Sequence, residues 1–193
     1  MQLEDDIIIE GEDLVLEELA AKHLTDLAII AVENPDLLQY SPTFFGSEKA
    51  IEVMIEDAQA DRKAGIRVAF AIYSKSLKKY IGSSSFGSIA LKDQRLEIGW
   101  TWLSPEVQGS GLNNKCKFLM LRHAFENMGI KRVEFRTDAR NIRSIKAIEK
   151  LGATKEGLLR SHMLMLDGQR RDTFYYSILT EEWPKLKTEV FGE

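Results

Sequence analysis

The segment Pro105-Glu106-Val107-Gln108-Gly109-Ser110-Gly111-Leu112-Asn113 decides the fold of this chain. It follows a strand-like run at residues 95–103 and precedes apolar residues with helical spacing. Two glycines at alternating positions let the backbone approach a ligand closely, and the first turn of a helix offers unpaired N–H groups at the positive end of its dipole. The segment therefore predicts an anion cradle suited to a phosphate or pyrophosphate. A tight strand-to-helix turn that binds no ligand is the alternative.

On both sides of this segment the apolar pattern switches between strands and helices. Strands are predicted at 13–19, 67–74, 80–90, 95–103, 132–137, 156–166 and 172–179. Helices are predicted at 21–33, 48–63, 112–128 and 141–151, with a short tail helix from 181. Residues 67–103 should form an antiparallel meander, whereas the strand-helix-strand crossover around the cradle requires a parallel pair. These expectations define a mixed α/β fold with a mostly antiparallel sheet flanked by helices.

Local start and stop signals support several of these boundaries. Ser47 is a suitable N-cap for the helix at 48–63, and Gly65 follows the end of that helix. Gly129 ends the helix after the cradle, whose apolar stripe comprises Phe118, Leu121, Ala124, Phe125 and Met128. Asp167-Gly168 is a favourable hairpin turn because glycine tolerates positive φ angles.

Length and composition predict one soluble domain that covers residues 1–193. The chain has 44% hydrophobic and 29% charged residues, and no Pro-, Gly- or Ser-rich linker divides it. No apolar run approaches the roughly 20 residues of a membrane span, and the acidic segment up to Glu12 does not resemble a secretion signal. We therefore expect a cytoplasmic protein, monomeric or homodimeric, with no membrane partner. A net charge of −4 argues against nucleic acid and favours an amine-bearing substrate.

Histidine and cysteine residues give no metal or nucleotidase motif. His23, His123 and His162 show no metal-ligand spacing, so no metal is expected. The lone Cys116 has no partner for an internal disulfide, and a buried core thiol is a better interpretation than a nucleophile paired with histidine. The glycine loop also lacks the Gly-Lys-Ser/Thr ending of a nucleotide-hydrolysing P-loop.

Two motifs together resemble the GCN5-related N-acetyltransferase (GNAT) superfamily. Gln108-Gly109-Ser110-Gly111-Leu112-Asn113 matches the pyrophosphate loop Gln/Arg-x-x-Gly-x-Gly/Ala except at Asn113, where a side chain replaces Gly or Ala. The more specific match is Asp138-Ala139-Arg140-Asn141-Ile142-Arg143-Ser144-Ile145-Lys146-Ala147-Ile148-Glu149-Lys150-Leu151-Gly152-Ala153-Thr154-Lys155-Glu156-Gly157. It resembles the branch of ribosomal-protein N-terminal acetyltransferases that contains RimJ and RimL. The resemblance covers roughly residues 12–183 and implies a GNAT-like sheet that splays at its parallel pair.

The resemblance also implies acetyl-CoA as the cosubstrate, without a metal. The pantetheine arm would enter the splayed sheet, pair with backbone groups of Trp102 and Leu103 and bind Asn141. Arg143 and Lys146, together with Arg140, would meet the 3′-phosphate, although a basic helix face of this kind is often only solvated. The pyrophosphate would be cradled by Gln108, Gly109, Ser110, Gly111, Leu112, Asn113 and Asn114.

Acetyl transfer to an amine needs a proton acceptor for the amine and a proton donor for the leaving thiolate. Glu97 is the candidate base, because alternation places it with Gly99 and Thr101 on one face of its strand, opposite to Leu96, Ile98, Trp100 and Trp102. A structural ion pair is the alternative for Glu97. Ser144 is the candidate acid by the resemblance, although Asn141 and Ser144 also suit a helix cap. Tyr175 and Tyr176 are further candidates for the acid.

The function expected is an N-acetyltransferase that transfers an acetyl group by direct amine attack on the thioester. The acceptor is a protein N-terminus or a small amine such as a polyamine, an amino acid or an aminoglycoside. It should bind near Tyr40, Pro42 and Phe44 in the loop between the first helices, and near His162 and Met163. The alternative is a non-catalytic acyl-CoA-binding or interaction protein on the same fold.

Overall fold

The computed structural model of the chain, which describes residues 6–193, is built on one mixed sheet of eight strands. The strand order is β1-β2-β3-β4-β5-β6-β8-β7, and among the described strands only β5 and β6 pair in parallel. The strands are β1 (Ile8–Glu10), β2 (Leu14–Glu18), β3 (Val68–Ser74), β4 (Lys79–Ala90), β5 (Arg95–Leu103), β6 (Arg132–Asp138), β7 (Thr154–Leu164) and β8 (Arg170–Leu179). The predicted fold class is therefore confirmed. Residues 1–5 of the predicted acidic segment lie outside the described residues.

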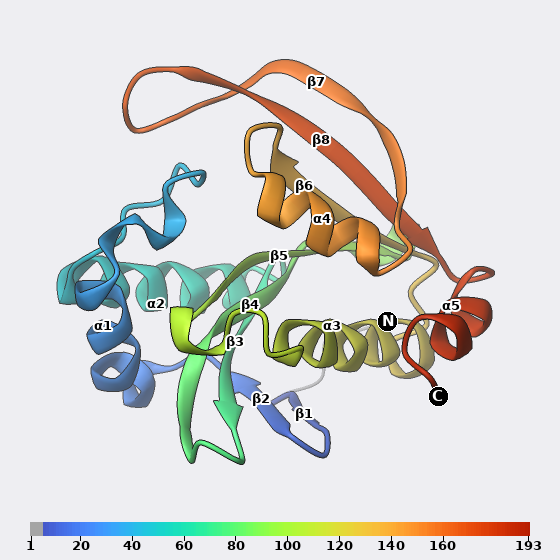
Figure 1. Cartoon of the computed structure of the whole chain (residues 1–193), viewed down its shortest axis with the longest axis horizontal. Coiled ribbons are helices and arrows are strands. Elements are labelled where there is room, and N and C mark those ends of the chain that lie inside the picture. Colours follow the sequence, from blue (N-terminus) through green and yellow to red (C-terminus); the bar gives the residue numbers. More distant parts are fainter. Residues whose placement is uncertain (1–5) are drawn as a thin grey trace.

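In the described part of the chain, five α-helices surround this sheet (Figure 1). They are α1 (Leu24–Glu33), α2 (Glu48–Lys63), α3 (Leu112–Arg122), α4 (Ile142–Lys150) and α5 (Trp183–Glu189). Short 3₁₀ turns cover Ala21–His23, Pro35–Leu38, Leu91–Asp93 and Pro105–Val107, and a π-helical turn at His123–Asn127 extends α3. Within residues 6–193, no helix combines the length and the apolar character that a membrane crossing requires.

Most predicted boundaries are confirmed, with local differences. Ser47 caps α2, because its hydroxyl accepts a hydrogen bond of 3.1 Å from the backbone N–H of Ala50. Gly129 and Gly168 both adopt positive φ angles, +64° and +79°. The helix predicted at 112–128 contains the π-helical turn, and the short β1 strand was not predicted.

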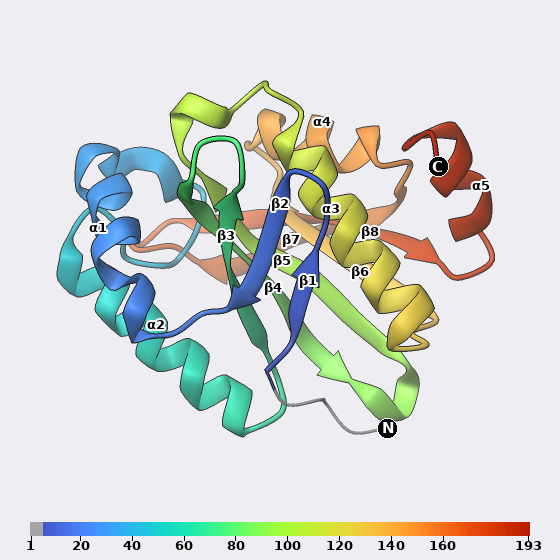
Figure 2. The same ribbon diagram turned by 90° about the horizontal axis from the view of Figure 1, so that it is seen from below.

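Two apolar clusters lie on opposite faces of the sheet. One face packs against α1 and α2, with Ala69, Ala71 and Trp102 contributed by the strands. The other face packs against α3 and α4 and includes Phe70 and Phe86. Figure 2 shows α1 and α2 on one side of the central strands and α3 on the other. The β7–β8 hairpin arches over α4 (Figure 1).

The sheet opens between its two parallel strands. Paired residues of β5 and β6 end at Glu97 and Glu134, yet β5 continues to Leu103 and β6 to Asp138. Beyond Glu97 the two strands therefore diverge, and both present unpaired edges toward the opening. The splay that was expected from the resemblance is present in the described sheet.

A β-bulge in β5 changes which residues share a face. Gly99 pairs with Ser85 and Trp102 pairs with Ser83, so two residues of β5 oppose Ser84 alone. Trp100 takes a left-handed φ of +50° at this point. The predicted alternation is consequently wrong after Gly99: Thr101 shares the α3 face, whereas the Trp102 side chain packs with α1 and α2.

Candidate active site

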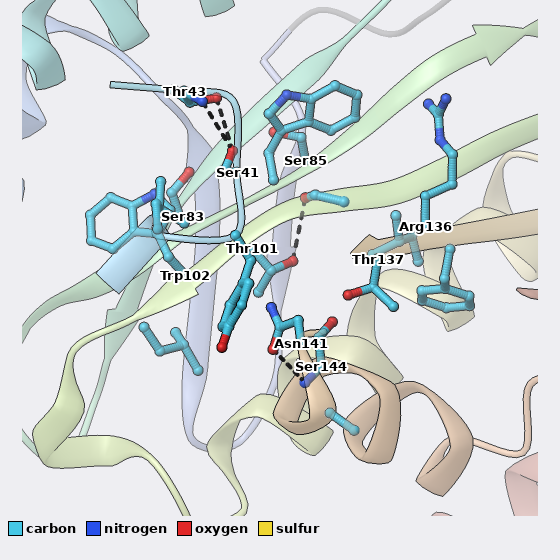
Figure 3. A pocket seen from close by; sticks show the side chains of 18 of the residues that line it. Ser41, Thr43, Ser83, Ser85, Thr101, Trp102, Arg136, Thr137, Asn141 and Ser144 are labelled. Atoms are coloured by element: carbon cyan, nitrogen blue, oxygen red, sulfur yellow. Dashed lines mark hydrogen bonds between the residues drawn. The ribbon is translucent and has the colours of Figure 1, made fainter. Parts of the chain in front are cut away.

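A cavity of about 540 Å³ lies at the opening between β5 and β6. Its walls come from both strands, from the starts of α3 and α4, and from the loop around residues 37–43. Asn141 and Ser144 project from α4 toward Thr101 on β5 (Figure 3). One continuous space thus joins the predicted anion cradle to the loop predicted to bind the acceptor.

The cradle has the backbone geometry that anion binding requires. Gly109 and Gly111 have φ angles of +80° and +89°, which L-residues rarely adopt. A Cβ atom at either position would meet nothing within 4 Å, so the backbone there faces open space. Gly111 is the N-cap of α3 and supplies no side-chain cap. The N–H of Leu112 donates to the Ser110 hydroxyl at 3.4 Å, whereas within residues 6–193 the N–H groups of Asn113 and Asn114 have no partner and remain available to a ligand.

The predicted cosubstrate residues divide into two groups. The residues that line the cavity are Trp102, Leu103, Gln108, Gly109, Asn113, Asn141 and Arg143. Those that do not line it are Ser110, Gly111, Leu112, Asn114 and Lys146. The side chain of Gln108 links the end of β5 to α4. Its amide NH₂ donates to the Leu103 carbonyl at 3.1 Å, and its oxygen accepts a hydrogen bond from Arg143. This carbonyl of Leu103 thus already accepts one hydrogen bond.

Asn141 caps α4 and also lines the cavity. Its Oδ1 accepts a hydrogen bond of 3.0 Å from the backbone N–H of Ser144. The capping contact of Ser144 therefore involves its backbone alone. Within residues 6–193 the Ser144 hydroxyl has no hydrogen-bond partner, and it lines the cavity. Capping and a role in chemistry are thus compatible in this pair, and the role of Ser144 as an acid stays a prediction.

Glu97 lines the cavity, but it is not a free carboxylate. It is 5% exposed and forms an ion pair with Arg136 of β6. Ser88 also donates to its Oε2 at 3.1 Å. The pair joins β5 to β6 at the point where the strands diverge, so Glu97 has a structural contact in addition to its access to the cavity. Its role as a base remains a prediction.

Alternative nucleophiles and acids lie away from the cavity wall. The Tyr176 hydroxyl donates to Glu149 at 3.0 Å, and burial together with this bond raises the pKa of Tyr176 to about 12. The Tyr175 hydroxyl accepts from Arg136 at 3.2 Å. Burial raises the pKa of the Cys116 thiol, which packs in the apolar cluster under α3. Neither tyrosine lines the cavity, and the thiol has the environment of a core residue.

Some of the predicted acceptor-binding residues line the cavity, and others lie outside it. Tyr40, Pro42 and Met163 line the cavity, whereas Phe44 is 73% exposed and does not. His162 is also absent from the lining, and its Nδ1 is 3.1 Å from the hydroxyl of Thr173. The loop predicted to hold the acceptor does reach the cavity, although Phe44 extends outward from it.

Four cationic residues of the cavity were not identified from the sequence: Arg67, Lys117, Arg136 and Arg171. Arg136 holds Glu97, and Arg171 donates to the Tyr40 carbonyl at 2.9 Å, which fixes the acceptor loop. Lys117 of α3 donates to Ser84 and Thr101 from a position that is 6% exposed. No sequence motif marks them. A lysine is ordinarily solvent-facing, but the apolar neighbours of Lys117 in the helix give a signal of burial.

A sheet that splays at its parallel pair, with a glycine-led helix start beside the opening, is the arrangement expected for the class of N-acetyltransferases. The chain belongs to the family described as the acetyltransferase (GNAT) domain, whose model matches residues 13–154. The chain is an acyltransferase by this membership.

Several relatives are consistent with that assignment. The uncharacterized N-acetyltransferase YoaA of Bacillus subtilis is 27% identical over 89% of this chain and 96% of its own length. YdaF of Bacillus subtilis, named provisionally as a ribosomal N-acetyltransferase, is 29% identical over 53% of this chain and 55% of its own length. A GCN5-related N-acetyltransferase from Brucella melitensis has a solved structure that is 28% identical, with a TM-score of 0.88 over 96% of this chain and 84% of that one.

Proposed function

We propose that this N-acetyltransferase takes its acetyl group from acetyl-CoA and passes it to a primary amine on a protein N-terminus or a small molecule. The observation that carries the proposal is the cavity at the opening of β5 and β6, which is continuous from Gly109 to Tyr40. An anionic cosubstrate would enter at the glycine end, and an acceptor would approach from the loop at the other end.

The residues present fit a CoA thioester. Gly109 and Gly111 leave open space before the helix N–H groups of Asn113 and Asn114, which have no partner within residues 6–193, and this suits a diphosphate. The edges of β5 and β6 beyond Glu97 offer backbone groups to the amides of a pantetheine arm. The side-chain NH₂ of Asn141 has no partner within residues 6–193 and could donate to the same arm, because the cap contact uses only Oδ1. Arg143 and Lys146 are the proposed partners of the 3′-phosphate.

The acceptor end also contains polar atoms that need a ligand. The hydroxyl of Ser85 and the indole N–H of Trp102 are buried without a hydrogen-bond partner among residues 6–193, and both residues line the cavity. Buried polar groups are ordinarily hydrogen-bonded, so a bound acceptor or an ordered water would satisfy them. Tyr40, Phe44, His162 and Met163 are the predicted contacts farther out.

Two side chains are proposed to move protons during transfer. The acceptor amine must be neutral to attack the thioester carbonyl, and an α-amino group has a reference pKa of about 7.7 to 8.0. Glu97, directly or through water, accepts the proton that the amine loses. When the C–S bond breaks, the Ser144 hydroxyl donates a proton to the departing sulfur and regains one from solvent. Positioning of the two reactants in the cavity supplies a large part of the rate.

Some finer assignments belong to the same proposal. The match of residues 138–157 supports a place in the RimJ/RimL branch, and the name of YdaF supports a ribosomal N-terminus as one acceptor to test. Since both apolar clusters pack on one sheet, we infer that the chain acts as one domain. Cytoplasmic location and a monomeric or homodimeric state are further parts of the proposal.

The test is a thiol-release assay with acetyl-CoA and a panel of amines that contains peptides with free N-termini, polyamines, amino acids and aminoglycosides. The proposal predicts amine-dependent release of free CoA for at least one acceptor. Calorimetric binding of acetyl-CoA without turnover on any amine would support the alternative, a non-catalytic acyl-CoA-binding protein. Absence of both binding and turnover would contradict the cosubstrate assignment itself.

A further inference from the structure

Lys117 is a buried amine at the wall of the cavity. It lies in the second turn of α3, and its side chain reaches the sheet between β4 and β5. Its Nζ donates to the hydroxyl of Ser84 at 2.9 Å and to that of Thr101. Those two hydroxyls are 2.8 Å apart, so the three groups form one compact polar cluster.

No carboxylate balances the charge of this amine. Within residues 6–193 no ion pair includes Lys117. From β4 and β5 it meets hydroxyls only, and on α3 its titratable neighbour is the Cys116 thiol, whose pKa is raised by burial. The Glu97–Arg136 ion pair lies toward the opposite face of β5.

Such a position is costly for a cation. Burial of a charge without a counter-ion is strongly unfavourable. Burial accordingly lowers the pKa of Lys117 to about 8. A leucine or methionine at this position would pack in the core without this cost, so the lysine requires a compensating role.

The helix geometry relates Lys117 to the cradle. Asn113 and Lys117 are four positions apart, so they share one face of α3 at about 6 Å along its axis. Both line the cavity. A diphosphate at the helix start would therefore be the first negative charge to come close to the ammonium group from the open side.

We propose that Lys117 is a positioning residue for the cosubstrate, the buried positive charge that the anionic diphosphate of the CoA thioester compensates. This inference rests on the proposed function, because it requires a CoA thioester in the cavity. Ser84 and Thr101 hold the amine in place while the site is free of ligand. Binding of the diphosphate then favours the protonated form of Lys117, so binding takes up a proton.

This coupling has a defined pH dependence. With a pKa of about 8, Lys117 is already charged in the free protein below about pH 7, and it takes up almost no proton on binding there. Above that pKa the free protein holds the neutral amine, and the bound form must recover the proton. At pH 8.5, a return of Lys117 toward its ordinary pKa predicts uptake of roughly 0.7 proton for each acetyl-CoA bound.

The experiment is isothermal titration of the full chain with acetyl-CoA at pH 6.5 and pH 8.5, in two buffers with different ionisation enthalpies. Acetyl-CoA has no free thiol, and its phosphate groups titrate below pH 7, so the ligand itself contributes little near pH 8.5. The variant is Lys117→Met, which keeps the length of the side chain. The matched control is Lys115→Met on the same helix, because Lys115 is exposed and paired with Asp13.

At pH 8.5 the wild type and Lys115→Met should take up more than half a proton, and Lys117→Met should take up none. At pH 6.5, where the 3′-phosphate of the ligand itself titrates, the three proteins should exchange the same number of protons. Lys117→Met should bind acetyl-CoA at least about tenfold more weakly at pH 6.5. Binding by the wild type without proton uptake at pH 8.5 overturns the inference, and this measurement does not require that any variant folds. Failure of the wild type to bind acetyl-CoA would instead contradict the proposed function.

Discussion

The substitution Ser144→Ala separates a chemical role of this residue from a structural one. In the structure the cap contact of α4 joins Asn141 Oδ1 to the backbone N–H of Ser144, and alanine retains that N–H. The hydroxyl has no other partner within residues 6–193. The free energy of unfolding of the variant should therefore fall by no more than about 0.5 kcal/mol, as expected for a substitution that breaks no buried contact.

The expected catalytic loss is much larger. A positioned general acid contributes about 10² to 10⁴ in rate, so kcat should fall at least tenfold in Ser144→Ala. A tenfold fall corresponds to about 1.4 kcal/mol of lost transition-state stabilisation. The affinity for acetyl-CoA should stay nearly unchanged, because only the transition state loses a partner.

Asn141→Ala supplies the contrasting variant. It removes the cap and should cost about 0.5 to 2 kcal/mol of stability. At roughly 2 to 4 °C for each kcal/mol in a chain of this size, the fall in Tm is measurable by calorimetry. Steady-state thiol release gives kcat for both variants. An unchanged kcat in Ser144→Ala would refute its role as the acid, and solvent would become the proton donor.

Three further changes test the cradle, the base and the ion pairs. Gly111→Val should weaken acetyl-CoA binding by at least tenfold, since a loss of even one charged hydrogen bond costs about 1.5 to 3 kcal/mol. Gly168→Val is the control, because it places similar backbone strain in a distant hairpin and should leave the affinity measured by calorimetry unchanged. If Gly111→Val bound acetyl-CoA as tightly as the wild type, the cradle assignment would be wrong. Glu97→Gln should lower kcat most near pH 6, and an unchanged rate over about pH 6 to 9 would make Glu97 a purely structural residue. The hydrogen bonds from Arg132 lower the pKa of Glu156 to about 2, so their stabilising effect is complete above about pH 4.5 and is lost as pH falls toward 2. Urea unfolding should accordingly show Glu156→Gln less stable than the wild type at pH 6 but equal to it near pH 2, and a difference that is constant with pH would contradict this.

Local signals in the sequence were sufficient for most of the fold. Ser47 and Asn141 both cap the helices that their positions predicted, because capping depends on residues within one turn. Helix α4 has the predicted course, since its apolar periodicity matches the face it buries. Strand β5 spans the predicted residues 95–103, although its alternation holds only up to Gly99. The two cradle glycines adopt the positive φ angles that their spacing indicated.

Features that depend on tertiary contacts escaped prediction. The bulge at Trp100 is fixed by pairing with β4 and cannot be read from alternation within β5. The strand β1 has three residues, and its one neighbour among the described strands is β2. The Glu97–Arg136 ion pair joins residues that lie 39 positions apart in the chain. Lys117 was missed for the same reason, because its hydroxyl partners belong to other elements.

The central claim is that this chain acetylates a primary amine with acetyl-CoA as the donor. Mass spectrometry of the products, after incubation of the full chain with acetyl-CoA and the amine panel, tests it most directly. The account predicts an acceptor that gains the mass of one acetyl group in an amount equal to the CoA released, with Ser144→Ala at least tenfold slower. CoA released without any acetylated amine, or no release at all in the presence of bound acetyl-CoA, would contradict it.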